Sequence, residues 1–344
     1  MRILLTADPI LPVPPAGYGG IERIVDALVR HYRAAGHEVG LVARPESTSP
    51  ASARFAWPGL RPGSKLDDLR NALALRGVVR GFRPEVLHSF SRLAYLGPLL
   101  PTRLPKVMSY QRHTGGRQIA WAARLGGRSL CFTGCSEFIC SMGRPAGGDW
   151  SAIPNFIEPE KFHFVPQVPA DAPLAFLSRI ESIKGPDLAI AIARGAGRRL
   201  LLAGNRPEGG GGREFWEREI APNLGRDGIE WIGEVDDVRK DQLLGRAAAL
   251  LLPIRWNEPF GIVFPEAFAT GTPVIACPRG AVPEIVADGQ TGFFISTVEE
   301  GIAAVHRLPE ISRAACRRAA EGRFSLAVCA EQYLGLYRKL AAGP

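Results

Sequence analysis

The sequence has few cysteines and no long apolar run. The first argues against a disulfide-stabilised fold, and the second against a membrane-spanning helix. Its 344 residues include six cysteines, too few to form the disulfide framework of a chain this long. No stretch approaches the roughly 18 apolar residues of a membrane-spanning helix. Residues 1–12 carry one basic residue and a short apolar stretch, which does not fit a secretory signal. We therefore expect a cytoplasmic protein, free or peripherally attached at the inner membrane face.

Three of the six cysteines lie close together, at Cys131, Cys135 and Cys140. Their C-x3-C-x4-C spacing matches neither a zinc site nor a common iron–sulfur motif, and the residues around them are apolar. The pattern favours thiols buried in a core over metal ligands. We expect no metal site in the chain.

Length and composition indicate a two-domain globular protein with a basic surface. A chain of 344 residues exceeds the usual size of one compact core, and its 46% apolar content is typical of folded proteins. The formal net charge of +8 suits phosphates, anionic lipids or nucleic acid without choosing among them.

Apolar strand patterns alternate with helical patterns in two successive series, which is typical of α/β proteins with doubly wound parallel sheets. Five prolines between 153 and 173 interrupt the alternation. The prediction is a Rossmann-like N-terminal domain at 1–160, a proline-rich linker at 161–173 and a second Rossmann-like domain at 174–325. A last helix, at 326–344, is expected to pack back toward the first domain. Ligands bind at the carboxyl ends of parallel strands, so two facing halves predict a site in the cleft between them.

A glycine-rich loop, Gly17-Tyr18-Gly19-Gly20, stands between the first strand and the first helix. Backbone N–H groups at the start of a helix can receive a phosphate. The loop lies about nine residues beyond the strand, whereas a dinucleotide fingerprint follows its strand at once. This spacing disfavours a nicotinamide-dependent oxidoreductase, and an ordinary turn stays open as the alternative.

Two cations follow the first strand of the second half, at Arg179 and Lys184. At the carboxyl end of a parallel strand they are placed to neutralise a diphosphate. By themselves they also fit a solvated loop.

Two carboxylates, Glu258 and Glu266, are separated by seven residues of a glycine-containing segment. The pattern aims one carboxylate and several amides at the expected cleft and puts the second carboxylate in the first turn of a helix. Paired carboxylates also occur in glycoside hydrolysis, and a carboxylate near a helix start can be purely structural.

The two glutamates match the E-x7-E motif of retaining glycosyltransferases, and the chain resembles glycosyltransferase family 4, whose fold is GT-B. Further matches occur in the family's order along nearly the whole chain. They are YGGIER at 18–23, GHEV at 36–39, PEVLH at 84–88, CSEF at 135–138, IPNFIE at 153–158, SRIESIKG at 178–185, LLAGN at 201–205 and DGQTGF at 288–293.

The resemblance implies a role for each matching residue. Arg179 and Lys184 would bind the diphosphate of a nucleotide-sugar, Glu266 the ribose hydroxyls and Glu258 the donor sugar. It also implies that further residues contact the donor: Gly19, Gly20, Asn205, Phe260, Gly261 and Ile262. Members of this family transfer sugars with retention of configuration and without a metal, because cations and amides stabilise the departing diphosphate.

The chain departs from the family pattern at two places. Phe156 stands where the family has a glycine, so this turn lacks its usual residue. The family's histidine near the sugar falls, depending on register, on Gln111 or His113. We take His113 as the catalytic candidate and leave Gln111 open.

The resulting expectation is a metal-independent, retaining glycosyltransferase with a nucleoside-diphosphate-sugar donor, UDP-sugars being favoured from family frequency. The acceptor is a saccharide, a lipid-linked glycan or a small molecule, and no nucleic acid or cofactor is expected. A nucleotide-sugar 2-epimerase of the same fold and a non-catalytic nucleotide-binding protein are the alternatives.

Overall fold

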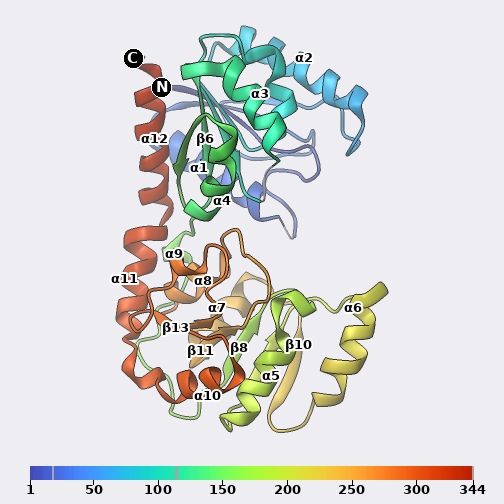
Figure 1. Ribbon diagram of the computed structural model, residues 1–344. Coiled ribbons are helices and arrows are strands. Elements are labelled where there is room, and N and C mark those ends of the chain that lie inside the picture. The colour runs from blue at the N-terminus through green and yellow to red at the C-terminus, as the bar shows by residue number, and fades with distance from the viewer. Residues whose placement is uncertain (18, 113–114, 343–344) are drawn as a thin grey trace. The chain divides into compact units, whose positions relative to one another are not determined.

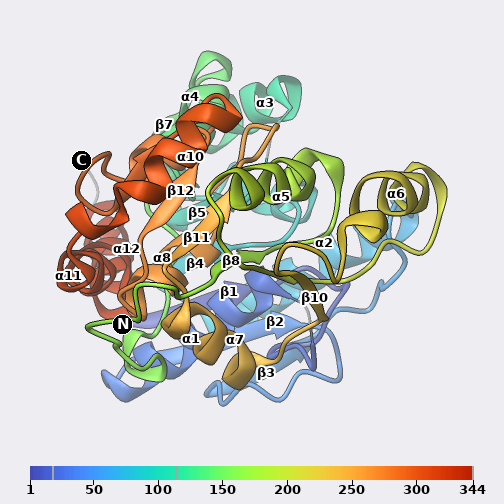
Figure 2. The same ribbon diagram turned by 90° about the horizontal axis from the view of Figure 1, so that it is seen from below.

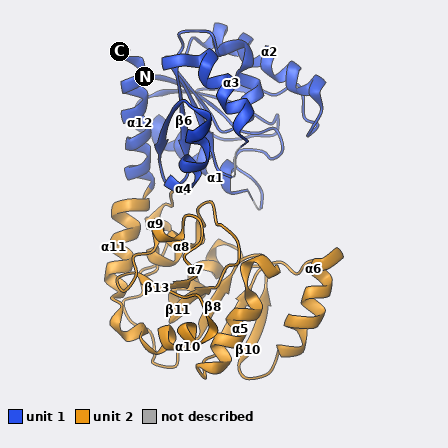
Figure 3. Ribbon diagram, viewed as in Figure 1, with its two compact units in different colours: residues 1–155, 326–344 blue, residues 156–325 orange. Residues whose placement is uncertain are grey.

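The structure is a computed structural model that describes residues 1–17, 19–112 and 115–342. It divides the chain into two compact units (Figure 3). Unit 1 comprises residues 1–155 and 326–344, and unit 2 comprises residues 156–325. The expected linker segment is therefore part of unit 2, and the last helix is part of unit 1.

Unit 1 is built on a seven-stranded sheet in which every strand pair is parallel. The strand order is β3-β2-β1-β4-β5-β6-β7, and Figure 2 shows the first five following one another. The central strands are buried on both faces, which explains their continuous apolar sequences. The strands are β1 (Arg2–Thr6), β2 (Glu38–Ala43), β3 (Ala53–Ala56), β4 (Val86–Ser89), β5 (Lys106–Tyr110), β6 (Leu130–Gly134) and β7 (Asp149–Ala152).

Helices cover both faces of this sheet (Figure 1). The long helices are α1 (Gly20–Ala34), α2 (Lys65–Phe82), α3 (Gly116–Gly126) and α12 (Leu326–Ala341), and the short ones are α4 (Glu137–Gly143) and the 3-10 helices η1 (Leu93–Leu99), η2 (Gly127–Ser129) and η3 (Arg144–Ala146). Helices α1 and α12 contact each other on one face. On the other face, α2, η1 and α3 share one apolar core with the strands.

Helix α12 is held in unit 1 by buried polar contacts. The Tyr337 hydroxyl lies 2.5 Å from Nδ1 of His88, and Nε2 of His88 lies 2.6 Å from Oγ of Ser109. All three side chains are buried, as are Tyr32 and Tyr333 beside them. Burial lowers the pKa of His88 to about 3, so its imidazole is neutral in the folded protein.

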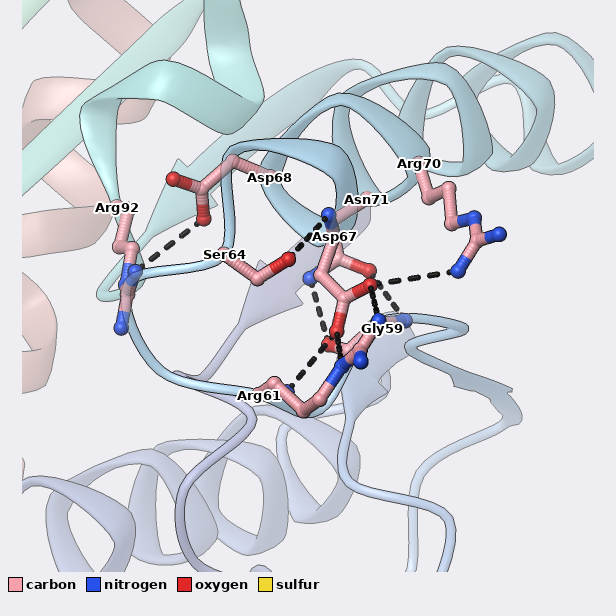
Figure 4. A network of polar contacts seen from close by, with 8 residues as sticks. All are labelled: Gly59, Arg61, Ser64, Asp67, Asp68, Arg70, Asn71 and Arg92. Atoms are coloured by element: carbon pink, nitrogen blue, oxygen red, sulfur yellow. Dashed lines mark hydrogen bonds and ion pairs between the residues drawn. The ribbon is translucent and has the colours of Figure 1, made fainter.

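The loop before α2 is fixed by a polar network around the start of that helix (Figure 4). The Ser64 hydroxyl caps the helix by accepting from the N–H of Asp67. Asn71 exchanges two hydrogen bonds with the backbone of Gly59. The carboxylate of Asp67 accepts from Arg61, which holds the pKa of this carboxyl below its usual value. The network ties this loop to the first turns of α2.

Unit 2 repeats the architecture with six parallel strands in the order β10-β9-β8-β11-β12-β13. They are β8 (Leu174–Leu177), β9 (Leu200–Ala203), β10 (Ile229–Gly233), β11 (Ala249–Leu252), β12 (Val274–Ala276) and β13 (Gly292–Phe294). Two parallel-sheet α/β units are the predicted fold class.

The helices of unit 2 follow its strands. The α-helices are α5 (Pro186–Gly195), α6 (Gly210–Phe215), α7 (Asp237–Arg246), α8 (Val263–Ala269), α9 (Val282–Ile285), α10 (Val298–His306) and α11 (Arg313–Phe324). The shorter segments are η4 (Pro159–Lys161), η5 (Ser182–Lys184), the π-helical turn η6 (Trp216–Ile220), η7 (Ala221–Asn223) and η8 (Leu308–Glu310).

Buried Arg313 ties α11 and the 156–173 segment to the body of unit 2. Its guanidinium donates to the carbonyl oxygens of Val165, Gly245 and Ala247 at 2.6 to 2.9 Å. Burial lowers its pKa to about 10, which still leaves the side chain charged at neutral pH. Carbonyl oxygens thus satisfy a buried cation, and the arginine has a structural role.

All six cysteines are buried and none forms a disulfide. For Cys131, Cys135 and Cys140 this confirms the prediction of buried thiols. Burial raises the pKa of Cys131 to about 11, and it raises those of Cys316 and Cys329 to about 12. These thiols are therefore protonated at neutral pH and pack as small apolar groups.

Candidate functional site

The carboxyl ends of β8 and β11 in unit 2 hold the Lys184 turn in place. Lys184 is the last residue of the 3-10 turn that precedes α5. Gly185 follows with φ of 75°, and a Cβ there would lie 2.1 Å from the carbonyl oxygen of Pro253. Only glycine allows both this conformation and this close approach. The turn therefore presses against the end of β11, and Glu258 lies on the loop beyond that strand.

Lys184 and Glu258 form a buried ion pair. The Lys184 Nζ lies 2.6 Å from Oε2 of Glu258, and the two side chains are only 11% and 13% exposed. The indole N–H of Trp256 donates to the same carboxylate oxygen at 2.9 Å. The ammonium also lies 4.4 Å from the centre of the Trp256 ring, within the range of a cation–π contact. A cation and a carboxylate are thus held rigidly together at the carboxyl edge of the sheet.

The backbone of Glu258 is fixed from the opposite side by Gly280. The two residues form an isolated parallel bridge, and the N–H of Ala281 donates to the Glu258 carbonyl at 2.8 Å. Gly280 has φ of 63°, and a Cβ there would lie 2.4 Å from that carbonyl oxygen. Neither Trp256 nor Gly280 was a candidate in the sequence. A glycine in the loop after β12 was the one available signal for this contact.

Glu266, the second glutamate of the motif, pairs with Lys240 of α7. Lys240 Nζ lies 2.6 Å from Oε1 of Glu266 and 3.1 Å from Asp237. Burial alone would lower the pKa of Lys240, but the charges and hydrogen bonds of Glu266 and Asp237 outweigh it and raise the pKa. Lys240 therefore stays protonated, and its ammonium holds the Glu266 carboxylate in a fixed orientation.

Arg179 and Asn205 lie at the same edge of the unit 2 sheet but are more exposed. Arg179 donates from Nη1 to Glu181 at 2.6 Å. The carbonyl of Asn205 accepts from the N–H of Ile180, which links the loops after β8 and β9. Of the two predicted cations, Lys184 is thus in the buried pair with Glu258, and the exposed Arg179 pairs with the half-buried Glu181.

The loop between Glu258 and α8 has a defined backbone. Phe260 is buried against Phe324, with ring centres 6.0 Å apart. Gly261 has φ of 82°, where a Cβ would lie 2.5 Å from the Phe264 ring. The carbonyls of Gly261 and Ile262 accept from the first residues of the helix. Phe260 therefore anchors the loop, and the backbone of the next two residues leads into α8.

In unit 1 the glycine loop leads into the first turn of α1. Gly19 is the residue before the helix and Gly20 its first residue. A Cβ on Gly19 would lie 2.8 Å from Pro15 and 3.0 Å from Oε2 of Glu22, whereas one on Gly20 would have nothing within 4 Å. The pKa of Glu22 is raised, chiefly by burial. Because Gly19 has no side chain, Pro15 and Glu22 can pack closely against its backbone. Gly20 has open space beside it.

Two side chains of unit 1, Ser49 and Gln111, have buried polar atoms without a hydrogen-bond partner among the described residues, and only Gln111 follows a strand at the candidate substrate position. It follows β5, and neither the nitrogen nor the oxygen of its buried side-chain amide has a partner among the described residues. Leaving such a group unpaired costs about 1–3 kcal/mol, so each exception calls for an explanation. His113, the other residue that the sequence left open, lies outside the described residues.

Two parallel-sheet α/β units, with polar side chains at the carboxyl edge of unit 2, are the architecture of the GT-B fold. A family model described as Glycosyltransferase Family 4 matches residues 18–161, and one described as Glycosyl transferases group 1 matches residues 160–322. Together the two matches run from residue 18 to residue 322. The chain belongs to this family of glycosyltransferases.

Individual relatives agree with the family match. A glycogen synthase of Mycobacterium tuberculosis is 26% identical over 381 residues, which cover 94% of this chain and 89% of the relative. The crystal structure of AviGT4, a glycosyltransferase involved in avilamycin A biosynthesis, is 26% identical with a TM-score of 0.73 and covers 100% of this chain and 98% of that one. Anabaena HepE, solved in complex with UDP and glucose, shares the fold with a TM-score of 0.68 at 18% identity, and the match covers 98% of this chain and 100% of that one.

Proposed function

We propose that this glycosyltransferase transfers a sugar, with retention of configuration, from a nucleoside-diphosphate sugar to a hydroxyl-bearing acceptor, with UDP-sugars as the preferred donors. The observation that carries the proposal is the buried Lys184–Glu258 pair beside Trp256. Burying two charges costs desolvation free energy, and two apolar side chains in the same place would often make the protein equally stable. A pair held at the ligand-binding edge of a parallel sheet suits a polar substrate.

Lys184 is the proposed electrophilic partner of the leaving diphosphate. Negative charge grows on the diphosphate as its bond to the sugar breaks, and a fixed ammonium stabilises that charge more in the transition state than in the ground state. Arg179 adds a second cation from the same loop. Its ion pair with Glu181 is partly solvent-exposed, so replacing Glu181 by a phosphate as its partner costs little free energy.

Glu258 is proposed to accept hydrogen bonds from donor-sugar hydroxyls. Its Oε2 already accepts from both Lys184 and Trp256, which fixes the orientation of the carboxylate. The backbone amides around Phe260, Gly261 and Ile262 are proposed to add further contacts to the same sugar. We propose Asn205, Gly19 and Gly20 as additional donor contacts on the basis of the family pattern.

A nucleotide panel tests the donor assignment. UDP, GDP and ADP, followed by their sugars, are added to the full chain, and the unfolding temperature is recorded. A nucleotide that binds only the folded state stabilises it by about 2.7 kcal/mol at a hundredfold excess over Kd. We expect UDP to give the largest shift, and an exclusive response to GDP or ADP would refute the UDP preference.

Turnover tests the reaction and its proposed independence of metal. With the donor chosen by the panel and an array of saccharide and polyol acceptors, product is expected with and without EDTA, because Lys184 and Arg179 supply the charge that a divalent cation would supply. The anomeric configuration of the product, read by NMR, should equal that of the donor. Strict dependence on added Mg2+ would contradict the metal-free mechanism, and an inverted product would contradict retention.

Glu266 is proposed to bind the ribose hydroxyls, and this gives a prediction about KM. A ribose contact exists before and during the reaction, so Glu266→Ala should raise the donor KM by roughly tenfold while kcat changes little. Lys240→Met should have the same effect in weaker form, because it removes the partner that orients Glu266. The measurement is steady-state kinetics together with nucleotide Kd. Unchanged nucleotide affinity in Glu266→Ala would show that the ribose lies elsewhere.

Gln111 is proposed to contact a substrate hydroxyl, because such a group can both accept from and donate to its unpaired amide. Gln111→Ala should lower kcat/KM by roughly tenfold without lowering the unfolding temperature, since no hydrogen bond to the described residues is lost. A variant with normal kinetics but lower stability would instead assign the amide a structural role. His113→Ala, measured in parallel, shows which of the two residues acts.

A further inference from the structure

Two helices of unit 1 carry stripes of exposed apolar side chains. On α2, Leu66, Leu69 and Leu73 are 52%, 56% and 54% exposed. On α3, Trp121 and Leu125 are 58% and 40% exposed. Spacings of three and four residues put the members of each group on one side of their helix. Single exposed leucines are ordinary, whereas two aligned groups mark an interaction surface.

On α3 the exposed stripe is also strongly basic. Arg117, Arg124 and Arg128 are spaced by helical turns with Trp121 and Leu125, so all five line one side of the helix and of the turn that continues it. The helix contains no acidic residue. Within the described part of the chain, none of these three arginines forms an ion pair. Their charges are available to an external partner.

On α2 both carboxylates form ion pairs with arginines of unit 1, so the exposed side of the helix has a net positive charge. The helix contains two acidic residues, Asp67 and Asp68, and Figure 4 shows both facing arginines of the network at its start. Asp67 is buried and pairs with Arg61 and Arg70, and Asp68 pairs with Arg92. The exposed side adds further cations from this helix: Lys65, Arg76 and Arg80.

The two stripes belong to one layer of unit 1. Leu75 of α2 and Ile119 and Ala122 of α3 pack into the same core. Helix η1 contacts both α2 and α3, and the two helices cover the face of the sheet opposite to α12 (Figure 2). The sides of α2 and α3 that carry the exposed residues therefore look outward from the same face. A broad surface can meet both at once.

We propose that this face of unit 1, the α2/α3 face, docks on an anionic lipid bilayer. Tryptophan and leucine between arginines form the pattern of a helix that lies in a membrane interface, with apolar side chains below the headgroups and guanidiniums at the phosphates. Anionic lipids supply the charge that matches the arginines. In the described part of the chain no helix is long and apolar enough to cross a membrane, so the docking is peripheral.

Vesicle flotation of the full chain tests the docking. Vesicles of phosphatidylcholine alone are compared with vesicles containing about 30% phosphatidylglycerol, which carry the negative surface potential. The protein is expected to float with the anionic vesicles and not with the neutral ones. Raising the salt from about 0.1 M to about 1 M should release most of it, because the Debye length falls from about 10 Å to about 3 Å.

Variants locate the surface on the two helices. Arg117→Gln/Arg124→Gln/Arg128→Gln should weaken binding to anionic vesicles by on the order of 100-fold, since each cation near such a surface contributes about fivefold. Trp121→Gln/Leu125→Gln should weaken it by on the order of tenfold or more, through the lost apolar insertion. In the wild type, tryptophan emission should shift to shorter wavelength on anionic vesicles, and Trp121→Gln should abolish the shift.

Matched controls lie on unit 2. Val238 of α7 is 66% exposed, and Arg218 is an exposed arginine, so Val238→Gln and Arg218→Gln make the same chemical changes elsewhere. Both controls should bind vesicles as the wild type does. Circular dichroism and the nucleotide-induced shift in unfolding temperature verify that every variant is folded.

Three results would overturn the proposal. One is flotation that is absent with anionic vesicles or equal with neutral ones. A second is loss of flotation in the unit 2 controls to the same extent as in the α3 variants. The third is self-association of the lipid-free chain, measured by sedimentation velocity, that the α3 variants abolish, because the face would then bind a second copy. None of these results bears on the donor assignment, which the nucleotide panel decides separately.

Discussion

Replacing Lys184 by methionine should lower kcat for sugar transfer by on the order of 100-fold or more, with a smaller change in donor KM. Methionine keeps most of the side-chain volume and removes the charge. The loss falls on kcat because the ammonium is worth most when the departing diphosphate has gained its charge. Steady-state kinetics with the donor from the nucleotide panel measure both constants. A rise in KM with kcat unchanged would make Lys184 a binding residue only.

The Lys184 variant also leaves Glu258 without its cation, so its stability has to be separated from its activity. Removing one partner of a buried pair leaves an uncompensated charge and costs up to about 3 kcal/mol here, since the pair is slightly exposed. In Lys184→Met/Glu258→Gln the remaining group is a neutral amide that still accepts from Trp256. We expect the double variant to recover stability but not kcat.

Lys184→Arg is a control variant that keeps the positive charge but changes the position and shape of the charged group. Arginine carries the cation but is longer and planar, and it donates from a fork rather than from a point. In the tight turn before Gly185 it should restore the ion pair to Glu258 only in part. We expect kcat between those of the wild type and Lys184→Met. Recovery of kcat by Lys184→Met/Glu258→Gln would show instead that the pair serves stability alone.

The buried strands could be predicted from the sequence because parallel strands covered on both faces are continuous apolar runs. The strand at Leu174–Leu177 begins and ends where its apolar run does. Edge strands lack this signal: β3 alternates partly buried and exposed residues, and β13 has three residues. An apolar run therefore does not mark either of these two strands in the sequence.

Helix boundaries depended on how Pro265 was interpreted. Proline is favoured at the first position of a helix, which would start this helix at Pro265, whereas α8 begins at Val263. The first N–H groups of a helix have no partner within it, so proline is tolerated at its third position as well. Glu266 is in the first turn in either case.

The candidate residues on one loop could be selected from the sequence, and their partners from other elements could not. Glu258 and Glu266 stand out because their spacing and the glycine between them are local. Lys240 comes from a helix with few apolar residues, and its contact with Glu266 spans 26 positions. Trp256 lies two residues from Glu258, but its shared contact with Lys184 depends on how the Lys184 turn packs against the end of β11.

Acid should destabilise unit 1 through His88. The pKa of this imidazole is about 3 in the folded protein, against 6.5 for an unperturbed histidine. The neutral side chain contributes its full stability above pH 6.5 and loses it as the pH falls toward 3, because only the unfolded state takes up the proton. At about pH 4.5, two units below 6.5, the loss amounts to about 3 kcal/mol.

His88→Gln isolates this contribution from the carboxylates that also titrate in acid. Glutamine does not titrate, and its amide can keep a hydrogen bond to Tyr337 or Ser109. The variant should be less stable than the wild type at pH 7.5 because its packing is poorer, but it should lose about 3 kcal/mol less on going to pH 4.5. Hydrogen exchange of amides in β4 and α12, followed by mass spectrometry, reports on unit 1 alone. Equal acid losses in the two proteins would mean that His88 takes up a proton without unfolding, and that helix α12 is not held by a neutral imidazole.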